Sequence, residues 1–372
     1  MLADRVKHIG ESKTFTVQKR AKELAATGKY VIDFGLGEPD FPTADVIKEA
    51  GKRAIEQNKT RYTAAEGVIE LRKALTEKLK REDGLIYTPE EIIVSNGAKH
   101  SLDNIMRILL DKGDKVLLPA PYWVSYIEQI KLAEGVPVIV HYDERITAEL
   151  VRKNKDGIKA VILNYPNNPT GTTIAPEEVE EIAWLAVKHD FFVISDEVYK
   201  KFLYDEKKHI SIARYAKDKT FVVDSVSKEF AMTGWRIGYV AGPREAVRAM
   251  ANMQSHTTSN PSSVSQYAAL EAMKENNQKH VQIMIQEYEK RRNLVQKALA
   301  ECSFYLPEGT FFFFIKIPEG NSLEFCSQLL EQKYVATVPG EAFGADNYFR
   351  LSYCTSEDRL TEGIRRIKEF MG

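Results

Sequence analysis

Short apolar runs rich in β-branched residues alternate with segments of helical periodicity through most of the chain after residue 91. Apolar runs of this length between turn residues are typical of buried strands, and the amphipathic segments between them are typical of covering helices. The pattern predicts an α/β fold: a large domain with a seven-stranded, mostly parallel sheet covered by helices. The strands are expected at residues 92–95, 115–118, 136–140, 160–163, 191–195, 221–224 and 237–241.

The ends of the chain predict further elements. An amphipathic helix within residues 1–30 is expected to end at Thr27 and Gly28, before a short strand at 30–34. Residues 264–300 form one nearly continuous helical pattern without proline, long enough to cross from one lobe to another. Between later helices, a smaller α+β domain is predicted from strands at 310–315, 334–338 and 348–352.

These elements suggest a division of the chain into domains. We expect an N-terminal segment, residues 1–44, that joins the small domain. The large domain is expected at residues 45–283, where helices at 44–58 and through Lys80 precede the first strand of the sheet. The small C-terminal domain is expected at residues 284–372.

Composition narrows the function classes. The chain has 372 residues, of which 44% are hydrophobic, and its 52 Lys and Arg balance 53 Asp and Glu. This balance gives no global positive field for nucleic acid, and no apolar run is long enough to span a bilayer. Cys302, Cys326 and Cys354 lack the paired spacing of metal sites, which favours buried, reduced thiols. With a mixed, polar beginning instead of a leader, we expect a cytoplasmic protein without metal, nucleic-acid or membrane partners.

A candidate nucleophile stands at the end of one predicted strand. Residues 224–228 (DSVSK) place Lys228 beside the hydroxyls of Ser225 and Ser227, and Arg236 follows eight residues later. An amine held at the mouth of a strand suits covalent chemistry with a carbonyl, so we interpret Lys228 as a Schiff-base lysine. A solvated loop amine is the alternative, because lysine is a common surface residue.

Other motifs follow strand-like runs in a characteristic order. Upstream of Lys228 stand residues 164–171 (NYPNNPTG) and 195–199 (SDEVY), and downstream stand residues 233–239 (TGWRIGY). Over nearly its whole length the sequence resembles the fold-type I, pyridoxal-phosphate-dependent aminotransferases of class I, in particular the prokaryotic aspartate aminotransferases. The resemblance implies the PLP transferase fold, pyridoxal 5'-phosphate as the cofactor, and a homodimer with shared active sites.

The resemblance also implies a reaction. It is the ping-pong transfer of an amino group between an L-amino acid, with aspartate and glutamate favoured, and a 2-oxo acid. An aromatic or alanine aminotransferase and a same-fold β-C–S lyase or aminocyclopropane-carboxylate synthase are the alternatives. A ligand-sensing regulator is disfavoured, because the chain starts directly with the aminotransferase region and no helix-turn-helix extension is expected.

A phosphate site is predicted where residues 95–101 (SNGAKHS) place a strand, a glycine turn and a helix start in sequence. Free amides at a helix N-terminus can receive a phosphate, here from Gly97, Ala98 and Lys99. The resemblance adds Ser225, Ser227 and Arg236 from the lysine segment, with Arg236 pairing the phosphate oxygens.

Asp196 stands at the end of a very apolar strand, where an unpaired charge would be costly. We therefore expect its carboxylate to face a cation. The alternative is that Asp196 is a helix N-cap. By resemblance Asp196 bonds the protonated pyridine nitrogen, while Tyr199 and Asn168 donate to the phenolic oxygen. Trp123 matches the aromatic residue that stacks on the ring, with Tyr122 or a plain core tryptophan as alternatives.

Substrate contacts are implied by the same resemblance. Lys228 holds the cofactor and then moves the substrate proton, Arg350 grips the α-carboxylate, and a backbone amide at Gly37 touches that carboxylate. A solvent-facing strand arginine is the alternative for Arg350. Within residues 35–42 (GLGEPDFP), the glycines and prolines indicate irregular backbone that approaches something closely, or a plain turn.

Residues from a second subunit are also implied. By resemblance, Tyr62 reaches the cofactor phosphate of the neighbouring subunit, and Arg107 and Thr14 reach the distal group of its substrate, with Lys13 as a further candidate. Solvated surface charges are the alternative for Arg107 and Lys13. An aromatic wall at residues 311–314 (FFFF), which would equally accept Tyr or Phe, is the alternative to a dicarboxylate site.

Overall fold

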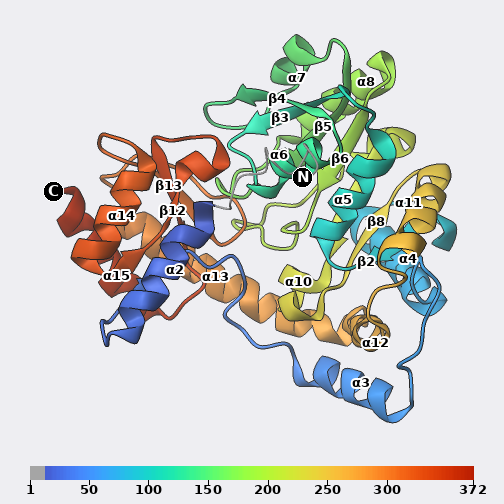
Figure 1. Cartoon of the computed structure of the whole chain (residues 1–372), viewed down its shortest axis with the longest axis horizontal. Helices are drawn as coiled ribbons and strands as arrows, with labels where there is room; N and C mark the ends of the chain where they lie inside the picture. The colour runs from blue at the N-terminus through green and yellow to red at the C-terminus, as the bar shows by residue number, and fades with distance from the viewer. Residues whose placement is uncertain (1–12) are drawn as a thin grey trace, which may run out of the picture.

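The computed structural model describes the backbone of residues 13–372 and the side chains of residues 17–372. Figure 1 shows two lobes. The larger lobe holds the main sheet and its helices, and the smaller lobe holds the C-terminal elements beside the N-terminal helix α2 (Lys13–Ala26). Helix α13 (Gln278–Ala298) runs from below the larger lobe to the smaller one.

The larger lobe is built on a seven-stranded sheet in the order β2-β8-β7-β6-β5-β3-β4. Neighbouring strands are parallel except at β8, which is antiparallel to both β2 and β7. The prediction of a seven-stranded, mostly parallel sheet is therefore confirmed. Its strands are β2 (Ile92–Ser95), β3 (Lys115–Ala120), β4 (Val136–His141), β5 (Ile158–Asn164), β6 (Phe192–Asp196), β7 (Thr220–Ser225) and β8 (Gly238–Ala241).

Helices cover both faces of this sheet, because alternate residues of a strand point to opposite sides. In β7, Phe221 and Val223 pack into one core with helices α5 and α11, whereas Val222 packs into another with α4 and α12. The helices of this lobe are α3 (Asp45–Glu56), α4 (Ile69–Asp83), α5 (Ala98–Leu109), α6 (Ser125–Leu132), α7 (Ala148–Asn154), α8 (Pro176–His189), α9 (Ala213–Ala216), α10 (Val226–Glu229), α11 (Arg244–Thr257) and α12 (Ser263–Ala272).

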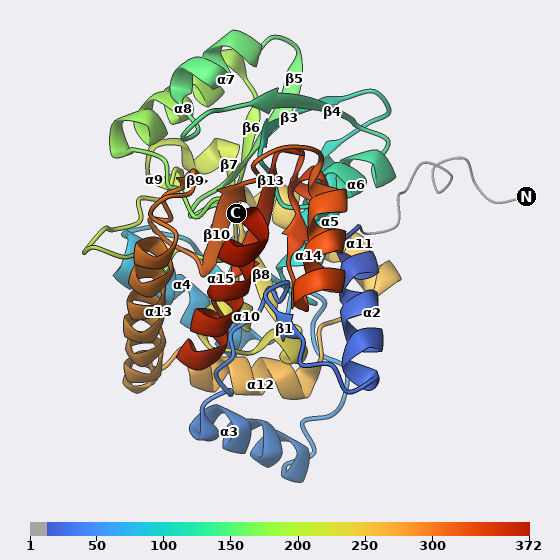
Figure 2. The same ribbon diagram turned by 90° about the vertical axis from the view of Figure 1, so that its left-hand side faces the viewer.

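The smaller lobe is an α+β unit, as predicted. Its four-stranded antiparallel sheet has the order β12-β13-β10-β9, and Figure 2 shows α14 and α15 in front of it. A parallel pair, β1 with β11, ties the N-terminal segment to this lobe. The elements are β1 (Ile32–Asp33), β9 (Phe304–Tyr305), β10 (Phe312–Lys316), α14 (Ser322–Lys333), β11 (Val335–Ala336), β12 (Val338–Pro339), β13 (Tyr348–Ser352) and α15 (Glu357–Met371).

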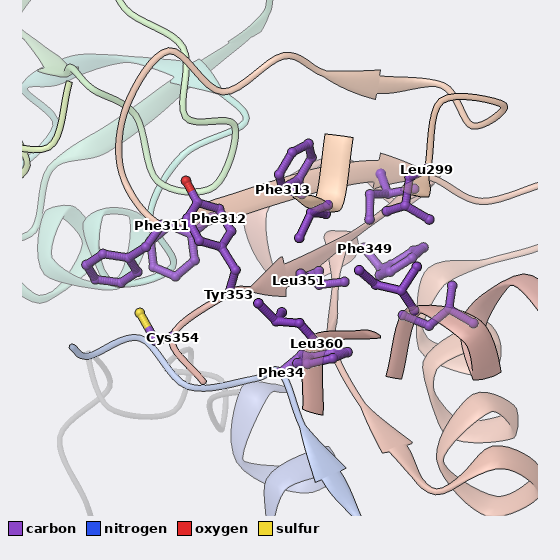
Figure 3. Close-up of a cluster of buried hydrophobic side chains, with 14 of the residues drawn as sticks. Phe34, Leu299, Phe311, Phe312, Phe313, Phe349, Leu351, Tyr353, Cys354 and Leu360 are labelled. Atoms are coloured by element: carbon purple, nitrogen blue, oxygen red, sulfur yellow. The ribbon is translucent and has the colours of Figure 1, made fainter. Parts of the chain in front are cut away.

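Aromatic side chains dominate the core of the smaller lobe. Figure 3 shows Phe313, Phe349 and Leu351 from the sheet packed near Phe34 of the N-terminal segment and Leu360 of α15. All five are completely buried. Burying such side chains stabilises the fold by about 1.5–3 kcal/mol each, so this core fixes the N-terminal segment against the smaller lobe.

The structure corrects two predicted elements. The expected helix over 264–300 is broken between α12 and α13, where Lys274 adopts an extended backbone (φ −70°, ψ 140°). The side-chain amide of Asn277 donates to the Glu271 carbonyl (2.7 Å), and this competition with the helical hydrogen bonds is typical of asparagine. The expected strand over 334–338 is divided into β11 and β12, which pair with different partners.

No helix within residues 13–372 combines the length and the apolar character needed to cross a membrane.

Candidate active site

A cavity of about 860 Å³ lies at the carboxyl edge of the parallel strands, where ligands of open α/β sheets bind. Strands β5, β6 and β7 end there at Asn164, Asp196 and Ser225, and Arg350 of β13 reaches it from the smaller lobe. Twelve of the predicted site residues line the cavity: Gly37, Ala98, Lys99, Trp123, Asn168, Asp196, Tyr199, Ser225, Ser227, Lys228, Arg236 and Arg350.

Other predicted site residues do not line the cavity. The Tyr62 side chain is 89% exposed outside the cavity. Arg107 lies on α5, where its Nε donates to Asp103 Oδ2 (2.8 Å), and it does not line the cavity of its own chain. Lys13 and Thr14 are in the first turn of α2, and their side chains fall outside the described residues.

The turn that we predict as the phosphate cup lies at the start of α5. Gly97 caps the helix with φ +86°, and no side chain caps the first amides of Ala98 and Lys99. The Arg236 guanidinium lies against this turn: a Cβ on Gly97 would be 2.5 Å from Arg236 Nη2. Glycine is therefore required here both for its backbone conformation and for the space that Arg236 occupies.

Ser225 shapes the other side of the cup. It ends β7 and caps the short helix α10, and its hydroxyl accepts from the Ser227 amide (3.3 Å). Lys228 follows on the same helix and is directed into the cavity, where its Nζ donates to the Gly37 carbonyl. Burial lowers the pKa of Lys228 to about 8, so a useful fraction of the amine is neutral near physiological pH.

Asp196 lies at the base of the cavity and is only 3% exposed. The Tyr126 hydroxyl donates to its Oδ2 (2.6 Å), and the Val198 amide donates to Oδ1 (3.4 Å). Burial raises the pKa of Asp196 to about 6, while the hydrogen bond from Tyr126 acts in the opposite direction. Among residues 17–372, no cation pairs with this carboxylate, so it can accept one from a ligand.

Arg350 is held on the opposite side of the cavity, 6% exposed. Its two terminal nitrogens donate to Asn168 Oδ1 (2.9 Å) and to the Gly35 carbonyl (3.0 Å), and its buried Nε has no acceptor. Phe312 lies 4.2 Å from the guanidinium carbon, measured to the ring centroid. Burial lowers the pKa of Arg350 to about 10, which still leaves a full positive charge at neutral pH.

Cations without carboxylate partners are the main electrostatic feature of the site. Lys99, Lys228, Arg236 and Arg350 all line the cavity, and within the described part of the chain none forms an ion pair. Arg350 is buried, and a buried charge is normally paired, while the other three cations add positive charge around the same cavity. The cavity is therefore suited to anionic ligands. The cup, the unpaired Asp196 and the amine of Lys228 together fit a phosphorylated pyridine aldehyde, which is the cofactor that the resemblance implies.

Some contacts were missed or misjudged at the sequence level. Tyr126, in the first turn of α6, was missed, although it stands only three residues after Trp123 and their ring centroids are 5.3 Å apart. The alternative of an aromatic wall does not hold for this cavity: Phe311, Phe312, Phe313 and Phe314 are fully buried and none lines it. Phe311 and Phe312 pack instead against Tyr199 from behind (centroids 5.5 and 5.8 Å apart).

Comparison with known proteins agrees with this geometry. The family Aminotransferase class I and II matches residues 29–367. A protein of Aquifex aeolicus named probable aspartate/prephenate aminotransferase is 45% identical over 99% of this chain and 98% of its own. The aspartate aminotransferase of Geobacillus stearothermophilus is 42% identical over 100% of this chain and 98% of its own.

A solved structure agrees equally well. The aspartate aminotransferase of Thermus thermophilus, determined with maleate, superimposes with a TM-score of 0.96 at 40% identity, covering 100% of this chain and 99% of its own. The sequence match, the fold and the anion-binding cavity all lead to the same family. The chain belongs to the class I and II aminotransferases, which are pyridoxal-phosphate-dependent enzymes.

Proposed function

We propose that this enzyme transfers the amino group between a dicarboxylic L-amino acid, aspartate or glutamate, and a 2-oxo acid. The observation that supports this chemistry is the charge distribution in the cavity. Among the described residues, Asp196 forms no ion pair with a cation, and four lining cations form no ion pair with a carboxylate. The substrate class is supported by the names of the similar proteins and by maleate, a dicarboxylate, in the Thermus thermophilus structure.

We assign the cofactor's phosphate to the cup at the start of α5. The amides of Ala98 and Lys99 would donate to it, as would the hydroxyls of Ser225 and Ser227. Arg236 would add the only guanidinium near this turn among the described residues. The positive φ of Gly97 keeps the turn open for both the phosphate and Arg236.

The pyridine ring is assigned to the space between Trp123 and Asp196. The Asp196 carboxylate would accept the hydrogen bond of the protonated ring nitrogen and keep the ring cationic. When bound, the cofactor supplies an electron-accepting ring that stabilises the carbanion left when the substrate loses its Cα proton. Tyr199 and Asn168 would donate to the phenolic oxygen.

Lys228 is assigned two tasks. Its amine would bond the cofactor's aldehyde carbon, and the aldehyde oxygen would leave as water. The lowered pKa of Lys228 favours this step because the neutral amine is the nucleophile. Once a substrate amine has taken its place, the Lys228 Nζ would accept the proton from the substrate Cα. The half-buried position of this amine at the cavity wall limits exchange of that proton with water.

Arg350 is assigned the substrate α-carboxylate. A carboxylate would replace the Asn168 side chain and the Gly35 carbonyl as acceptors, in the bidentate geometry that arginine favours. The site of Gly37 next to Arg350 agrees with a backbone contact to the same carboxylate; a Cβ there would lie 3.8 Å from Arg350 Nη2.

The distal carboxylate of aspartate needs a further cation. Lys228, Arg236 and Arg350 are already assigned, and the Lys99 ammonium lies over the Trp123 ring, 5.0 Å from its centroid. Arg107 does not line the cavity of its own chain. We therefore propose that Arg107 of the partner subunit supplies this charge in a homodimer with shared active sites. Thr14 and Lys13 of the partner subunit would lie beside it, and Tyr62 of the partner subunit would reach the phosphate.

The domain boundaries and the cellular location are proposals of the same kind. We propose the division at residues 44 and 283, because β1 pairs with β11 of the smaller lobe and α13 connects the lobes. A cytoplasmic location is supported by the free cysteines, which suit a reducing compartment.

Steady-state kinetics test this function directly. Aspartate, glutamate, alanine, tyrosine and phenylalanine should be compared as donors with 2-oxoglutarate as the acceptor. We expect aspartate to have the highest kcat/KM, and no turnover without the 2-oxo acid. Release of ammonia and pyruvate without an acceptor would identify a lyase instead, and a preference for tyrosine or phenylalanine would reject the dicarboxylate assignment.

A further inference from the structure

Two buried carboxylates stand on either side of the turn that carries Lys228. Asp224 precedes this turn near the end of β7, and Glu229 directly follows Lys228. Both side chains are 3% exposed, and neither lines the active-site cavity. Lys228 therefore faces the cavity while its two acidic neighbours face the protein interior behind it.

Glu229 is held by a lysine from α4. The Lys78 ammonium, 2% exposed, lies 2.9 Å from Glu229 Oε2 and also pairs with Glu82. Burial alone would lower the pKa of Lys78, but its carboxylate partners raise it above the usual value, so the lysine stays charged. The last residue of α10 is thereby tied to the C-terminal half of α4.

Asp224 is held in the same way from the other side of the turn. The Lys200 ammonium lies 2.7 Å from Asp83 of α4 and 3.4 Å from Asp224. The Tyr239 hydroxyl also donates to Asp224 Oδ2 (2.9 Å). Lys200 directly follows Tyr199, so this contact joins the two cavity segments that carry Tyr199 and Lys228.

A stabilising role alone explains this arrangement poorly. Buried ion pairs contribute little net stability compared with well-packed apolar side chains, because both charges must be desolvated. They do fix geometry, since each buried charge has few acceptable positions. Here the ion pairs fix Asp224 and Glu229, which lie on the two sides of the short turn that carries Lys228.

We propose that two sets of buried ion pairs, Lys78 with Glu229 and Lys200 with Asp83 and Asp224, act together as a positioning network that holds the Lys228 amine at the cofactor's aldehyde carbon. These are positioning residues, because none lines the cavity. The inference rests on the proposed role of Lys228, so borohydride reduction and peptide mapping of the wild-type holoenzyme come first. A tag on another lysine would reject the role of Lys228 itself, before the network is tested.

The test compares holoenzymes of Lys78→Met, Lys78→Arg and the double variant Lys78→Met with Glu229→Gln. The readouts are the rate of cofactor loss to a carbonyl trap and the pH midpoint of the visible absorbance of the cofactor–Lys228 bond. Lys78→Met leaves a carboxylate unpaired next to Lys228, which favours the protonated form of that bond. We expect the midpoint to rise by about one pH unit and cofactor loss to be about tenfold faster.

The other variants distinguish an effect on the position of Lys228 from a general loss of protein stability. Lys78→Arg keeps the charge and should stay near the wild-type values, and the double variant should recover most of the loss, because no unpaired charge remains on Glu229. Arg292→Met is the matched control, since Arg292 is equally buried (4% exposed) but pairs with Asp205 outside the cavity. It should lower the Tm without moving the midpoint. The titratable and charged groups that face Lys228, which are Cys354, Glu38, Arg350 and Arg236, are unchanged in every variant.

One pattern overturns the proposal. If Lys78→Met lowers the Tm as Arg292→Met does and leaves both the midpoint and the cofactor-loss rate unchanged, the network only supports the fold. Should Lys78→Met fail to fold, Glu229→Gln gives the same test with a milder change, because Lys78 keeps Glu82 as a partner. An unmoved midpoint and cofactor-loss rate in Glu229→Gln would then overturn the proposal.

Discussion

At the residue scale, Asp196 is the side chain whose surroundings constrain the chemistry most. A carboxylate this deeply buried, without a cation among the described residues, is stable only if a ligand brings the positive charge. Tyr126 contributes the strongest contact to it within the chain, and its own hydroxyl is buried and directed only at Asp196. The pair therefore acts as one unit that holds a negative charge at the base of the cavity.

Replacing Asp196 tests this role directly. Asp196→Ala should give a folded protein with weakly held cofactor and kcat lowered by a factor on the order of 100 or more, because the ring nitrogen loses its counter-charge. Asp196→Glu should retain more of both properties. Equilibrium dialysis of the cofactor and steady-state kinetics measure the two effects. Near-normal turnover of the alanine variant would mean that the carboxylate only shapes the backbone.

Removing the Tyr126 hydroxyl should raise the pKa of Asp196 further. Tyr126→Phe deletes a hydrogen bond to a charged acceptor, worth about 1.5–3 kcal/mol, so we expect cofactor affinity to fall roughly 10- to 100-fold. The matched control is Tyr122→Phe, because Tyr122 lines the same cavity without bonding Asp196. Equal losses in both variants would show that the Tyr126 hydroxyl has no special effect on Asp196.

The pKa of Lys228 predicts how the rate of cofactor binding to the apoenzyme depends on pH. Its pKa is lowered by burial to about 8, and only the neutral amine attacks an aldehyde. The rate of reconstitution should therefore rise with pH and level off above about pH 8, and it should be slow at pH 6. Stopped-flow absorbance after addition of the cofactor measures it. A rate that keeps rising towards pH 10 would mean that the amine keeps the pKa of a solvated lysine.

At the element scale, the strand, turn and helix around Gly97 carry the proposed phosphate site. The backbone at φ +86° and the Arg236 side chain occupy the region where a Cβ would project. This part of the site could be predicted from sequence because a glycine between an apolar run and a helix start has few structural meanings. The contact between Gly97 and Arg236 could not, because it depends on the antiparallel pairing of β2 with β8.

Two glycines with similar backbone angles give a matched test of the cup. Gly97→Ala should weaken cofactor binding by about 1–3 kcal/mol, because it combines a strained φ with a clash against Arg236. Gly113→Ala has a similar φ of +92° but no atom within 4 Å of the added Cβ, so it reports the backbone strain alone. Calorimetric titration with the cofactor compares them. Unchanged affinity in Gly97→Ala would reject the cup as the phosphate site.

Other elements show which features of the fold the sequence pattern predicts and which it does not. All seven strands of the large sheet were predictable, because each is an apolar run between turn residues. The break between α12 and α13 was not, since Asn277 is compatible with a helix and only its bond to the Glu271 carbonyl decides the outcome. Tyr126 was missed for a related reason: an aromatic residue on an amphipathic helix has the pattern of a core residue until its acceptor is known.

At the scale of the whole molecule, the cavity joins both lobes and the N-terminal segment. Arg350 comes from the smaller lobe, Lys228 from the larger one, and Gly35 and Gly37 accept hydrogen bonds from these two side chains. The segment from Gly35 to Asp40 is itself fixed to α13, because Arg291 pairs with Asp40 (2.8 Å). A change in the relation between the lobes would therefore alter the distance between Arg350, the proposed α-carboxylate site, and the amine of Lys228.

The proposed second subunit leads to a complementation experiment. Lys228→Ala should be inactive, because no amine can bond the cofactor or move the substrate proton. Arg107→Ala should lose kcat/KM for aspartate by about 1.5–3 kcal/mol, roughly 10- to 100-fold, and change little for phenylalanine. If Arg107 acts only within its own chain, neither variant can repair the other, because every site would keep one defect.

If Arg107 acts across the interface, the two variants complement each other. Equal amounts, unfolded and refolded together, should give about half heterodimers, and each heterodimer has one site with an intact Lys228 and an intact Arg107 of the partner subunit. Activity towards aspartate should then reach about a quarter of the wild-type value, well above either variant alone. Refolding each variant separately before mixing is the control. An activity no higher than the average of the two parents would assign Arg107 to the surface of its own subunit, and the distal carboxylate would need another cation.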